Sequence, residues 1–345
     1  MTTILFVLLV GYLGLVFVLG IVSVMFWGIL GLKYRPFKGE PQTWPSVAIV
    51  CSAFNEELVI EQSLQHLVVA IRKYPGCVVV MIANDGSTDG TASLISDFTA
   101  GNPGIEVVFF NDGQNQGRVI QLERMIKFAL AREFEVIISF DADCVLDSNS
   151  VTELVRPLAS DTSIDAVTGN IVLIPCPTVS KLLNTSVRAF YSLVTQVLRR
   201  GQSVLGTVSV IGGGFTAIRS SSLRRCVDEI MSSSMWKVGR DDNAIALTML
   251  KYKMRLVFQA TAIFRHPGAV SGRAWLHQHT RYQTDRHLKY RALFHLLRVQ
   301  PVFVIGMGVV ELLGFLLIRW PVLLLKKLLK FDGYRVGIGV YRWKV

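Results

Sequence analysis

Residues 135–146 read EVIISFDADCVL, an apolar run that stops on Asp141 and Asp143 with one small residue between them. Val136 to Phe140 suits a strand buried on both faces and is too short for a helix. The aspartates would then follow the strand at its C-terminal end, the edge of an open α/β sheet where ligands bind. Carboxylates at this spacing can approach one divalent cation and the polar groups of a nucleotide together. Taken alone, an acidic turn explains the same residues.

The surrounding sequence alternates strand-like and helix-like segments from residue 47 onward. The expected strands are Val47–Cys51, Val78–Ala83, Ile105–Phe110 and Val136–Phe140, and the expected helices are Glu57–Lys73, Thr88–Ala100, Val119–Arg132 and Asn149–Ala159. This alternation predicts an α/β fold with a doubly wound, mostly parallel sheet, in a domain over residues 46–271.

The composition favours a soluble domain joined to membrane segments. The chain of 345 residues is 51% hydrophobic, yet carries 36 basic and 25 acidic residues. Residues 4–32 contain no charged side chain, a run longer than the roughly 20 residues that cross a bilayer. We therefore expect a transmembrane anchor over residues 1–33 and a linker over residues 34–45. Basic residues follow the apolar run at once, which predicts a cytoplasmic catalytic domain on a plasma or inner membrane.

The C-terminal quarter also suggests contact with lipid. Residues 272–299 interleave apolar with basic side chains, which is typical of an amphipathic interfacial helix, and residues 300–345 form an apolar segment with a basic tail. That segment either spans the membrane or re-enters it. Much of the net charge of +11 lies beside these apolar stretches, which favours anionic membrane lipids as partners and argues against nucleic acid. The five cysteines lack Cys-x-x-Cys spacing and indicate reduced thiols, without a zinc site or disulfide.

Polar clusters follow each of the first four expected strands. Asn55 and Glu57 follow the first strand, and Asp85 follows the second, where a carboxylate can accept an N–H of a base. Gly86 would allow a close backbone approach, and Ser87 would cap the next helix. Arg118, after the third strand, is either a phosphate ligand or a solvated surface residue. Four such clusters at one sheet edge predict a ligand site.

The second half of the domain adds three candidate groups. In the stretch 209–218, SVIGGGFTAI, three glycines interrupt a strand-like run. This pattern suggests a bulge or a place where a ligand lies directly against the backbone. Asp241 and Asp242 open a helical pattern, so one of them is a candidate general base, although an acidic first turn also suits a helix dipole. His266 is a weaker candidate for a place near the metal or diphosphate, because a histidine before a proline is more often a turn residue.

Taken together, these motifs resemble the membrane-bound inverting family-2 glycosyltransferases of GT-A fold, and most of all the hyaluronan, chitin, cellulose and poly-N-acetylglucosamine synthases. The motifs are Asn55-Glu56-Glu57, Asn84-Asp85-Gly86-Ser87-Thr88-Asp89-Gly90, Asp141-Ala142-Asp143, Arg240-Asp241-Asp242 and Gln278-x-x-Arg281-Tyr282. Five ordered motifs across residues 46–286 are far more specific than any one of them.

The resemblance implies a role for each motif. It implies that Asp85 recognises the uracil of a UDP-sugar, and that Asp141 and Asp143 hold ribose, sugar and a Mg²⁺ or Mn²⁺ ion. Asp242 would be the base that deprotonates the acceptor. It further implies that Gln278, Arg281 and Tyr282 bind the diphosphate. It also implies that Gly213, Gly214 and Phe215, with Asp241 beside them, contact the acceptor.

The resemblance also implies a membrane glycosyltransferase that extends a polysaccharide or lipid-linked acceptor, alone, as a homo-oligomer or with a membrane partner subunit. Three residues depart from the family pattern: Asn84 replaces an aspartate, Asp241 a glutamate and Tyr282 a tryptophan. The last departure weakens the case for processive synthesis, since an aromatic platform for a terminal sugar is changed. The alternatives are a single-sugar transferase to a lipid carrier and a catalytically silent nucleotide-sugar-binding protein.

Overall fold

The structure is a computed structural model that describes residue 18, residues 21–175, 180–211 and 214–267, and residues 292 and 296. Most of the expected anchor, all but two residues of the expected interfacial helix over 272–299, and the C-terminal region over 300–345 therefore lie outside the described residues. No helix within the described ranges is long and apolar enough to cross a bilayer.

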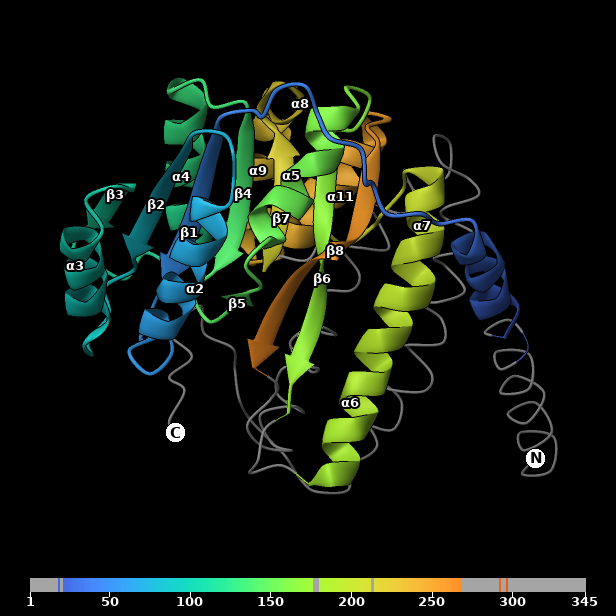
Figure 1. Ribbon diagram of the computed structural model, residues 1–345, viewed down its shortest axis with the longest axis horizontal. Helices are drawn as coiled ribbons and strands as arrows, with labels where there is room; N and C mark the ends of the chain where they lie inside the picture. The colour runs from blue at the N-terminus through green and yellow to red at the C-terminus, as the bar shows by residue number, and fades with distance from the viewer. Residues whose placement is uncertain are drawn as a thin grey trace, which may run out of the picture.

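The first half of the domain is the predicted alternation of strands and helices (Figure 1). In chain order its elements are β1 (Val47–Ala53), α2 (Ile60–Arg72), β2 (Val78–Asn84), α3 (Thr91–Gly101), β3 (Glu106–Asn111), α4 (Arg118–Ala131), β4 (Val136–Asp141), β5 (Val145–Leu146) and α5 (Ser150–Ser160). Strands β3, β2, β1 and β4 lie side by side and parallel in that order. Their carboxyl ends therefore meet at one edge, as the sequence predicts.

The second half turns the sheet into a mixed one. Its elements are β6 (Ala166–Ile174), α6 (Lys181–Leu193), the π-helical η1 (Val194–Arg199), α7 (Arg200–Leu205), β7 (Phe215–Arg219), α8 (Ser220–Arg224), α9 (Val227–Ser232), α10 (Ser234–Lys237), α11 (Asp241–Lys251) and β8 (Leu256–Pro267). The sheet order is β3-β2-β1-β4-β7-β6-β8-β5, and β7 runs antiparallel to both β4 and β6. The sheet is thus parallel throughout its first half, whereas in the second half only β6 and β8 pair in parallel and β7 and β5 pair antiparallel with their neighbours.

The reversal at β7 has a direct consequence for the site. Because β7 is antiparallel to β4, it begins where β4 ends, and Phe140 faces Phe215 across the pair. The turn before β7 consequently lies at the same edge as the aspartates, and the backbone N–H of Asp141 donates to the carbonyl of Gly214 at 3.2 Å.

Two apolar clusters fill the two faces of the sheet. Successive side chains of a strand point to opposite faces, and β1 follows this rule: Ala48 and Val50 join one cluster, and Val47, Ile49 and Cys51 join the other. A sheet buried on both faces explains why the first strands are continuous apolar runs.

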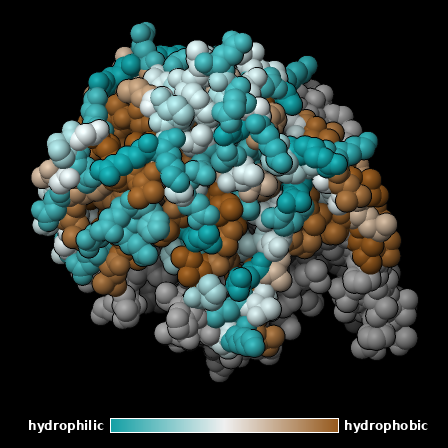
Figure 2. All heavy atoms as spheres, in the orientation of Figure 1, coloured by the Kyte–Doolittle hydropathy of each residue, from teal (hydrophilic) through white to brown (hydrophobic). Residues whose placement is uncertain are grey.

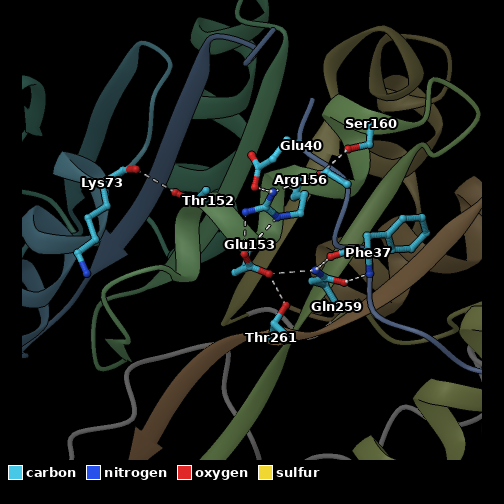
Figure 3. A network of polar contacts seen from close by, with 10 residues as sticks. Phe37, Glu40, Lys73, Thr152, Glu153, Arg156, Ser160, Gln259 and Thr261 are labelled. Atoms are coloured by element: carbon cyan, nitrogen blue, oxygen red, sulfur yellow. Dashed lines mark hydrogen bonds and ion pairs between the residues drawn. The ribbon is translucent and has the colours of Figure 1, made fainter. Parts of the chain in front are cut away.

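Residues 34–45, expected as a linker, lie against the domain. The Tyr34 hydroxyl donates to the carbonyl of Phe258 at 3.0 Å, and the fully buried Gln259 exchanges two hydrogen bonds with the backbone of Phe37. Figure 3 shows how Glu153 and Arg156 of α5 continue this network to the segment. These contacts hold the segment to β8 and α5.

The helix over residues 21–32 packs on α7. A side chain at Gly201 would lie 2.5 Å from the Trp27 carbonyl, so glycine is needed for the two helices to approach this closely. Trp27 is fully buried, whereas Met25, Ile29 and Leu32 are exposed. Apolar side chains gather over this helix at the right of the molecule in Figure 2.

Candidate active site

The loops after β1 and β2 are tied to each other. The backbone N–H of Asn55 donates to the Ser87 hydroxyl at 3.0 Å, and the Asn55 side-chain oxygen accepts the N–H of Thr88 at 2.8 Å. Glu57 accepts the N–H of Gly90 at 2.6 Å. The expected helix cap by Ser87 is wrong, because α3 begins at Thr91 after Gly90 and the Ser87 hydroxyl serves the neighbouring loop instead.

Asp85 is buried at the end of β2 and is 3% exposed. Its carboxylate accepts the N–H groups of Gln116 and Gly117 at 2.9–3.0 Å and the side-chain amide of Gln121 at 3.2 Å. The residue proposed to read a base therefore holds the loop between β3 and α4.

Gly86 makes a close backbone approach, which was expected toward a nucleotide. It has a φ of 69°, and a Cβ there would lie 2.4 Å from the backbone nitrogen of Asn115. The approach is made to this chain's own loop.

Arg118, the first residue of α4, links α4 to β4 and α11 at the acidic end of the site, which is formed by Asp141, Asp143, Asp241 and Asp242. Its Nη2 lies 2.8 Å from a carboxylate oxygen of Asp141 on β4 and 3.3 Å from one of Asp241 on α11. Burial works to lower the pKa of Arg118, but the surrounding carboxylates, Asp141 first, outweigh it and raise that pKa. Burial raises the pKa of Asp141 against the opposing charge of Arg118. Arg118 is thus the counter-ion of the site, and its side chain remains 38% exposed to solvent.

A second cluster lies on the other side of Asp141. His266 Nε2, at the end of β8, lies 3.3 Å from an Asp143 oxygen, and the Cys144 thiol contacts the other oxygen at 3.7 Å. Burial works to lower the pKa of His266, but Asp143 outweighs it and raises that pKa to about 9. His266 in turn outweighs burial at Asp143 and holds the pKa of that carboxyl below its usual value.

The donor atoms of this cluster could hold a metal ion. One atom each from Asp143, Cys144 and His266 lie within 4.8 Å of one another. A carboxylate and an imidazole together suit a divalent transition metal. Cys144 was expected to be an ordinary reduced thiol, and its position directly after Asp143 is the sequence signal for a place in this cluster.

Glu56 is a further acid that sequence reasoning passed over in favour of its neighbours Asn55 and Glu57. Burial, together with the charges of Asp143 and Asp141, raises its pKa to about 8. The side chain therefore belongs electrostatically to the acidic end of the site.

The expected acceptor side borders the same carboxylates. A side chain at Gly214 would come within 3.4 Å of an Asp141 oxygen and 2.8 Å of the Phe264 ring, so the turn leaves no room there for a Cβ. Phe215 is fully buried between Phe140 and Phe264 and supports this turn from behind.

The two acids of α11 differ. Asp241 is buried against Arg118, and Asp242 is half-buried in the first turn, where its carboxylate accepts the N–H of Asn243 at 2.7 Å. The charge of Asp242 acts on both Arg118 and Asp141, which places it in the same electrostatic cluster. The remaining predicted site residues, Gly213, Gln278, Arg281 and Tyr282, lie outside the described residues.

The family model described as "Glycosyl transferase family 2" matches residues 48–227, which include the strands and loops of this site. The chain belongs to glycosyltransferase family 2. This match confirms the resemblance inferred from the motifs.

Curated relatives agree with that assignment. The chain is 27% identical over 202 residues to a poly-β-1,6-N-acetyl-D-glucosamine synthase of Staphylococcus epidermidis, covering 56% of this chain and 45% of the relative. A Staphylococcus aureus synthase of the same name is 27% identical over 180 residues, covering 51% of this chain and 40% of the relative. The chain thus matches less than half the length of these relatives.

A solved structure confirms the fold. A mannosyltransferase of Pyrobaculum calidifontis, in complex with GDP-Man and Mn²⁺, superposes with a TM-score of 0.66 at 20% identity, covering 94% of this chain and 86% of that one. The GT-A character of the sheet is therefore established independently of the motifs.

Proposed function

We propose that this family 2 member transfers a hexose or N-acetylhexosamine, with inversion, from a UDP-sugar to a growing polysaccharide or a lipid-linked acceptor. The observation that carries the proposal is the convergence of three carboxylates, Asp141, Asp143 and Asp242, with the cations Arg118 and His266 at one sheet edge. A diphosphate donor needs a divalent cation beside it, and an acceptor needs a base; this edge supplies ligands for both.

The metal site is proposed to hold Mn²⁺ or Mg²⁺ on Asp143 and His266, and metal binding would release the His266 proton, because a metal-bound imidazole is neutral. The imidazole favours Mn²⁺, because Mg²⁺ is bound mainly by oxygen atoms. When bound, the ion would neutralise charge that develops on the departing diphosphate. Asp141, held by Arg118 at 2.8 Å, is proposed to orient the donor's ribose and sugar.

Asp242 is proposed to remove the proton of the acceptor hydroxyl while that oxygen attacks the anomeric carbon. Asp241 is bound to Arg118 and is proposed to set the position of the helix start that carries Asp242. Direct displacement at the anomeric carbon by this route inverts its configuration. From the motif alone, Gln278, Arg281 and Tyr282 are proposed to bind the diphosphate.

The proposed location is the cytoplasmic face of a membrane, with membrane lipids, and either further copies of the chain or a partner subunit, as neighbours. Support comes from the uncharged run over residues 4–32 and the basic residues that follow it.

The test is nucleotide release by the purified full chain in detergent with Mn²⁺, Mg²⁺ or EDTA. UDP-N-acetylglucosamine, UDP-glucose, UDP-galactose and GDP-mannose would be supplied in turn. We expect metal-dependent release from a UDP-sugar. Release from GDP-mannose alone would overturn the UDP assignment, and binding without release would support the silent nucleotide-sugar-binding alternative. Product size then separates polymer synthesis from transfer of one sugar to a lipid carrier.

A further inference from the structure

A fully buried thiol, Cys144, lies directly after Asp143 in the loop between β4 and β5. Strand β5 pairs antiparallel with β8, and the register of that pairing, continued by one residue, places Cys144 opposite His266. The next residue back on β8, Arg265, holds this register through two hydrogen bonds of 3.0 Å to the carboxylate of Asp147. The pairing of β5 with β8 therefore brings two adjacent potential ligands to an imidazole.

The position of the Cys144 thiol is held by its own backbone. The N–H of Cys144 donates to the carbonyl of Asp141 at 3.0 Å, and the carbonyl of Cys144 accepts the hydroxyl of Ser63 on α2 at 2.7 Å. On one side of the thiol, a Cβ at Gly214 would lie only 3.3 Å from Sγ. These contacts keep the thiol directed toward Asp143.

The distances within this cluster suit a tetrahedral metal ion. Cys144 Sγ lies 3.7 Å from one oxygen of Asp143, and His266 Nε2 lies 3.3 Å from the other. One donor atom from each of the three residues lies within 4.8 Å of the other two. Ligand atoms bound to Zn²⁺ lie about 3.3–3.6 Å from one another, because each is about 2.0–2.3 Å from the ion. Small side-chain movements are therefore enough to bring all three donors to one ion.

His266 is already oriented as a metal ligand. Its Nδ1 lies within hydrogen-bond distance of the carbonyl of Pro267, which can only accept. In the neutral ring Nδ1 therefore carries the proton, and the free lone pair is on Nε2, the atom that faces Asp143. Ligating histidines typically donate their other ring N–H in this way. The side chains of His266 and Asp143 are 26% and 27% exposed, so an ion can reach them from solvent.

Among the cysteines that the structure describes, Cys144 alone belongs to such a group of ligands. Cys226 donates to a backbone carbonyl, Cys51 is buried within β1, and Cys77 is exposed. A core position would explain the burial of Cys144, as it does for Cys51, but it does not explain a carboxylate and an imidazole beside the thiol. The absence of Cys-x-x-Cys spacing does not exclude a site here, because one ligand comes from β8.

We propose that Asp143, Cys144 and His266 bind a thiophilic divalent cation such as Zn²⁺ or Co²⁺, and that this ion inhibits sugar transfer by displacing Mn²⁺ or Mg²⁺. Thiolate ligands select softer ions, and the affinity of such a site rises from Mn²⁺ toward Zn²⁺. A thiol binds a metal as the thiolate, so binding releases the thiol proton, and that of a protonated imidazole, to solvent.

The charge of the ligands explains why the bound ion inhibits. A thiolate and a carboxylate together neutralise the two positive charges of the ion, which then attracts the negative charge of a departing diphosphate less strongly. Binding of the ion depends only on the geometry of the cluster. Inhibition rests on the proposed function, because it supposes that an ion on Asp143 supports transfer.

The first test titrates the reduced full chain in detergent with Co²⁺ under anaerobic conditions. We expect the near-ultraviolet charge-transfer absorption of a cobalt–thiolate bond, and we expect added Zn²⁺ to remove it. Cys144→Ser should lose this absorption, whereas Cys77→Ser, which changes an exposed thiol, should keep it. His266→Asn should weaken Co²⁺ binding at least about tenfold.

Absence of the absorption in the wild type, its persistence in Cys144→Ser, or an unchanged Co²⁺ affinity in His266→Asn would overturn the proposal. Melting temperatures of the metal-free variants show whether each is folded. Should Cys144→Ser not fold, the wild type and His266→Asn still decide the outcome.

The second test measures UDP release at increasing Zn²⁺ with Mn²⁺ present. The quantity compared is the ratio of the half-inhibitory Zn²⁺ concentration to the half-activating Mn²⁺ concentration, which does not depend on the absolute rate. This ratio should be well below one in the wild type, rise at least about tenfold in Cys144→Ser, and stay unchanged in Cys77→Ser. A wild-type ratio of one or more, or an equal ratio in Cys144→Ser, would contradict the proposed inhibition.

The two tests separate this site from the proposed function. If the wild type releases no nucleotide from any donor, the proposed function fails. The cobalt titration still judges the site in that case, because it requires no turnover.

Discussion

The two ends of the candidate site are held by different interactions, hydrogen bonds at one end and ion pairs at the other. At the proposed nucleotide end, Asn55, Asp85 and Ser87 have their oxygen atoms occupied by N–H groups of neighbouring loops. At the acidic end, Asp141 and Asp143 are compensated by the charged groups of Arg118 and His266. The first arrangement is complete in the folded chain, whereas the second gathers more acids than bases.

That surplus has a measurable signature at Glu56. Burial and the charges of Asp143 and Asp141 raise its pKa to about 8, so a further negative charge there is unfavourable. A divalent cation would relieve this repulsion. The comparison therefore predicts that substitutions at the acidic end impair turnover and spare the fold, and that those at the nucleotide end impair the fold as well.

Asp143→Ala should have the largest effect on turnover. It removes the carboxylate that His266 and the proposed metal share, so metal-dependent UDP release should be lost. The protein should remain folded, because this carboxylate lies at a sheet edge outside the apolar clusters. Asp112→Ala, which removes an exposed ion pair with Arg124, is the control. Wild-type turnover in Asp143→Ala would refute the metal assignment.

Asp242→Asn should have the second-largest effect on turnover. It should retain donor and metal binding and lose transfer by roughly 10²- to 10⁴-fold, the usual contribution of a positioned general base. Asp241→Asn keeps an oxygen near Arg118 and should lose roughly tenfold or less. Calorimetry for donor binding beside initial rates separates the two effects. A more damaging Asp241→Asn would move the base assignment away from Asp242.

Asp85→Ala tests the proposed nucleotide end and should lower the free energy of unfolding by about 3 kcal/mol, because two part-buried backbone N–H groups and the buried Gln121 amide lose their acceptor. Thermal unfolding of the full chain measures this effect, and Asp97→Ala, an exposed acid on α3, should be neutral. A folded Asp85→Ala protein of wild-type stability would show that Asp85 is not required to hold the loop between β3 and α4.

Gly86→Ala should have the smallest effect of the four, a loss of about 2 kcal/mol in unfolding free energy from the positive φ and from the clash with Asn115. Gly113→Ala is its control, since Gly113 has the same positive φ of 70° with open space around it. Comparing the two melting temperatures isolates the cost of the clash. Equal decreases in the melting temperatures of Gly86→Ala and Gly113→Ala would mean that the loop carrying Gly86 and the loop carrying Asn115 separate easily.

The first half of the fold was predictable because its signals are local. Val78–Ala83 is an uninterrupted apolar run, and β2 extends it by the single residue Asn84. The direction of β7 was not predictable, because a short apolar segment fits a parallel or an antiparallel neighbour equally well. The same limit applies to Arg118, whose two carboxylate partners come from strands and helices far apart in the sequence.

By itself, the sequence determined which residues end the first four strands and therefore which polar groups share an edge, since parallel strands with intervening helices bring their carboxyl ends together. Only the tertiary structure decided how those groups are compensated. It brought His266 to Asp143 across 123 positions of chain and placed Arg118 between Asp141 and Asp241. Ion pairs depend on distances between side chains after packing, and no spacing along the chain encodes those distances.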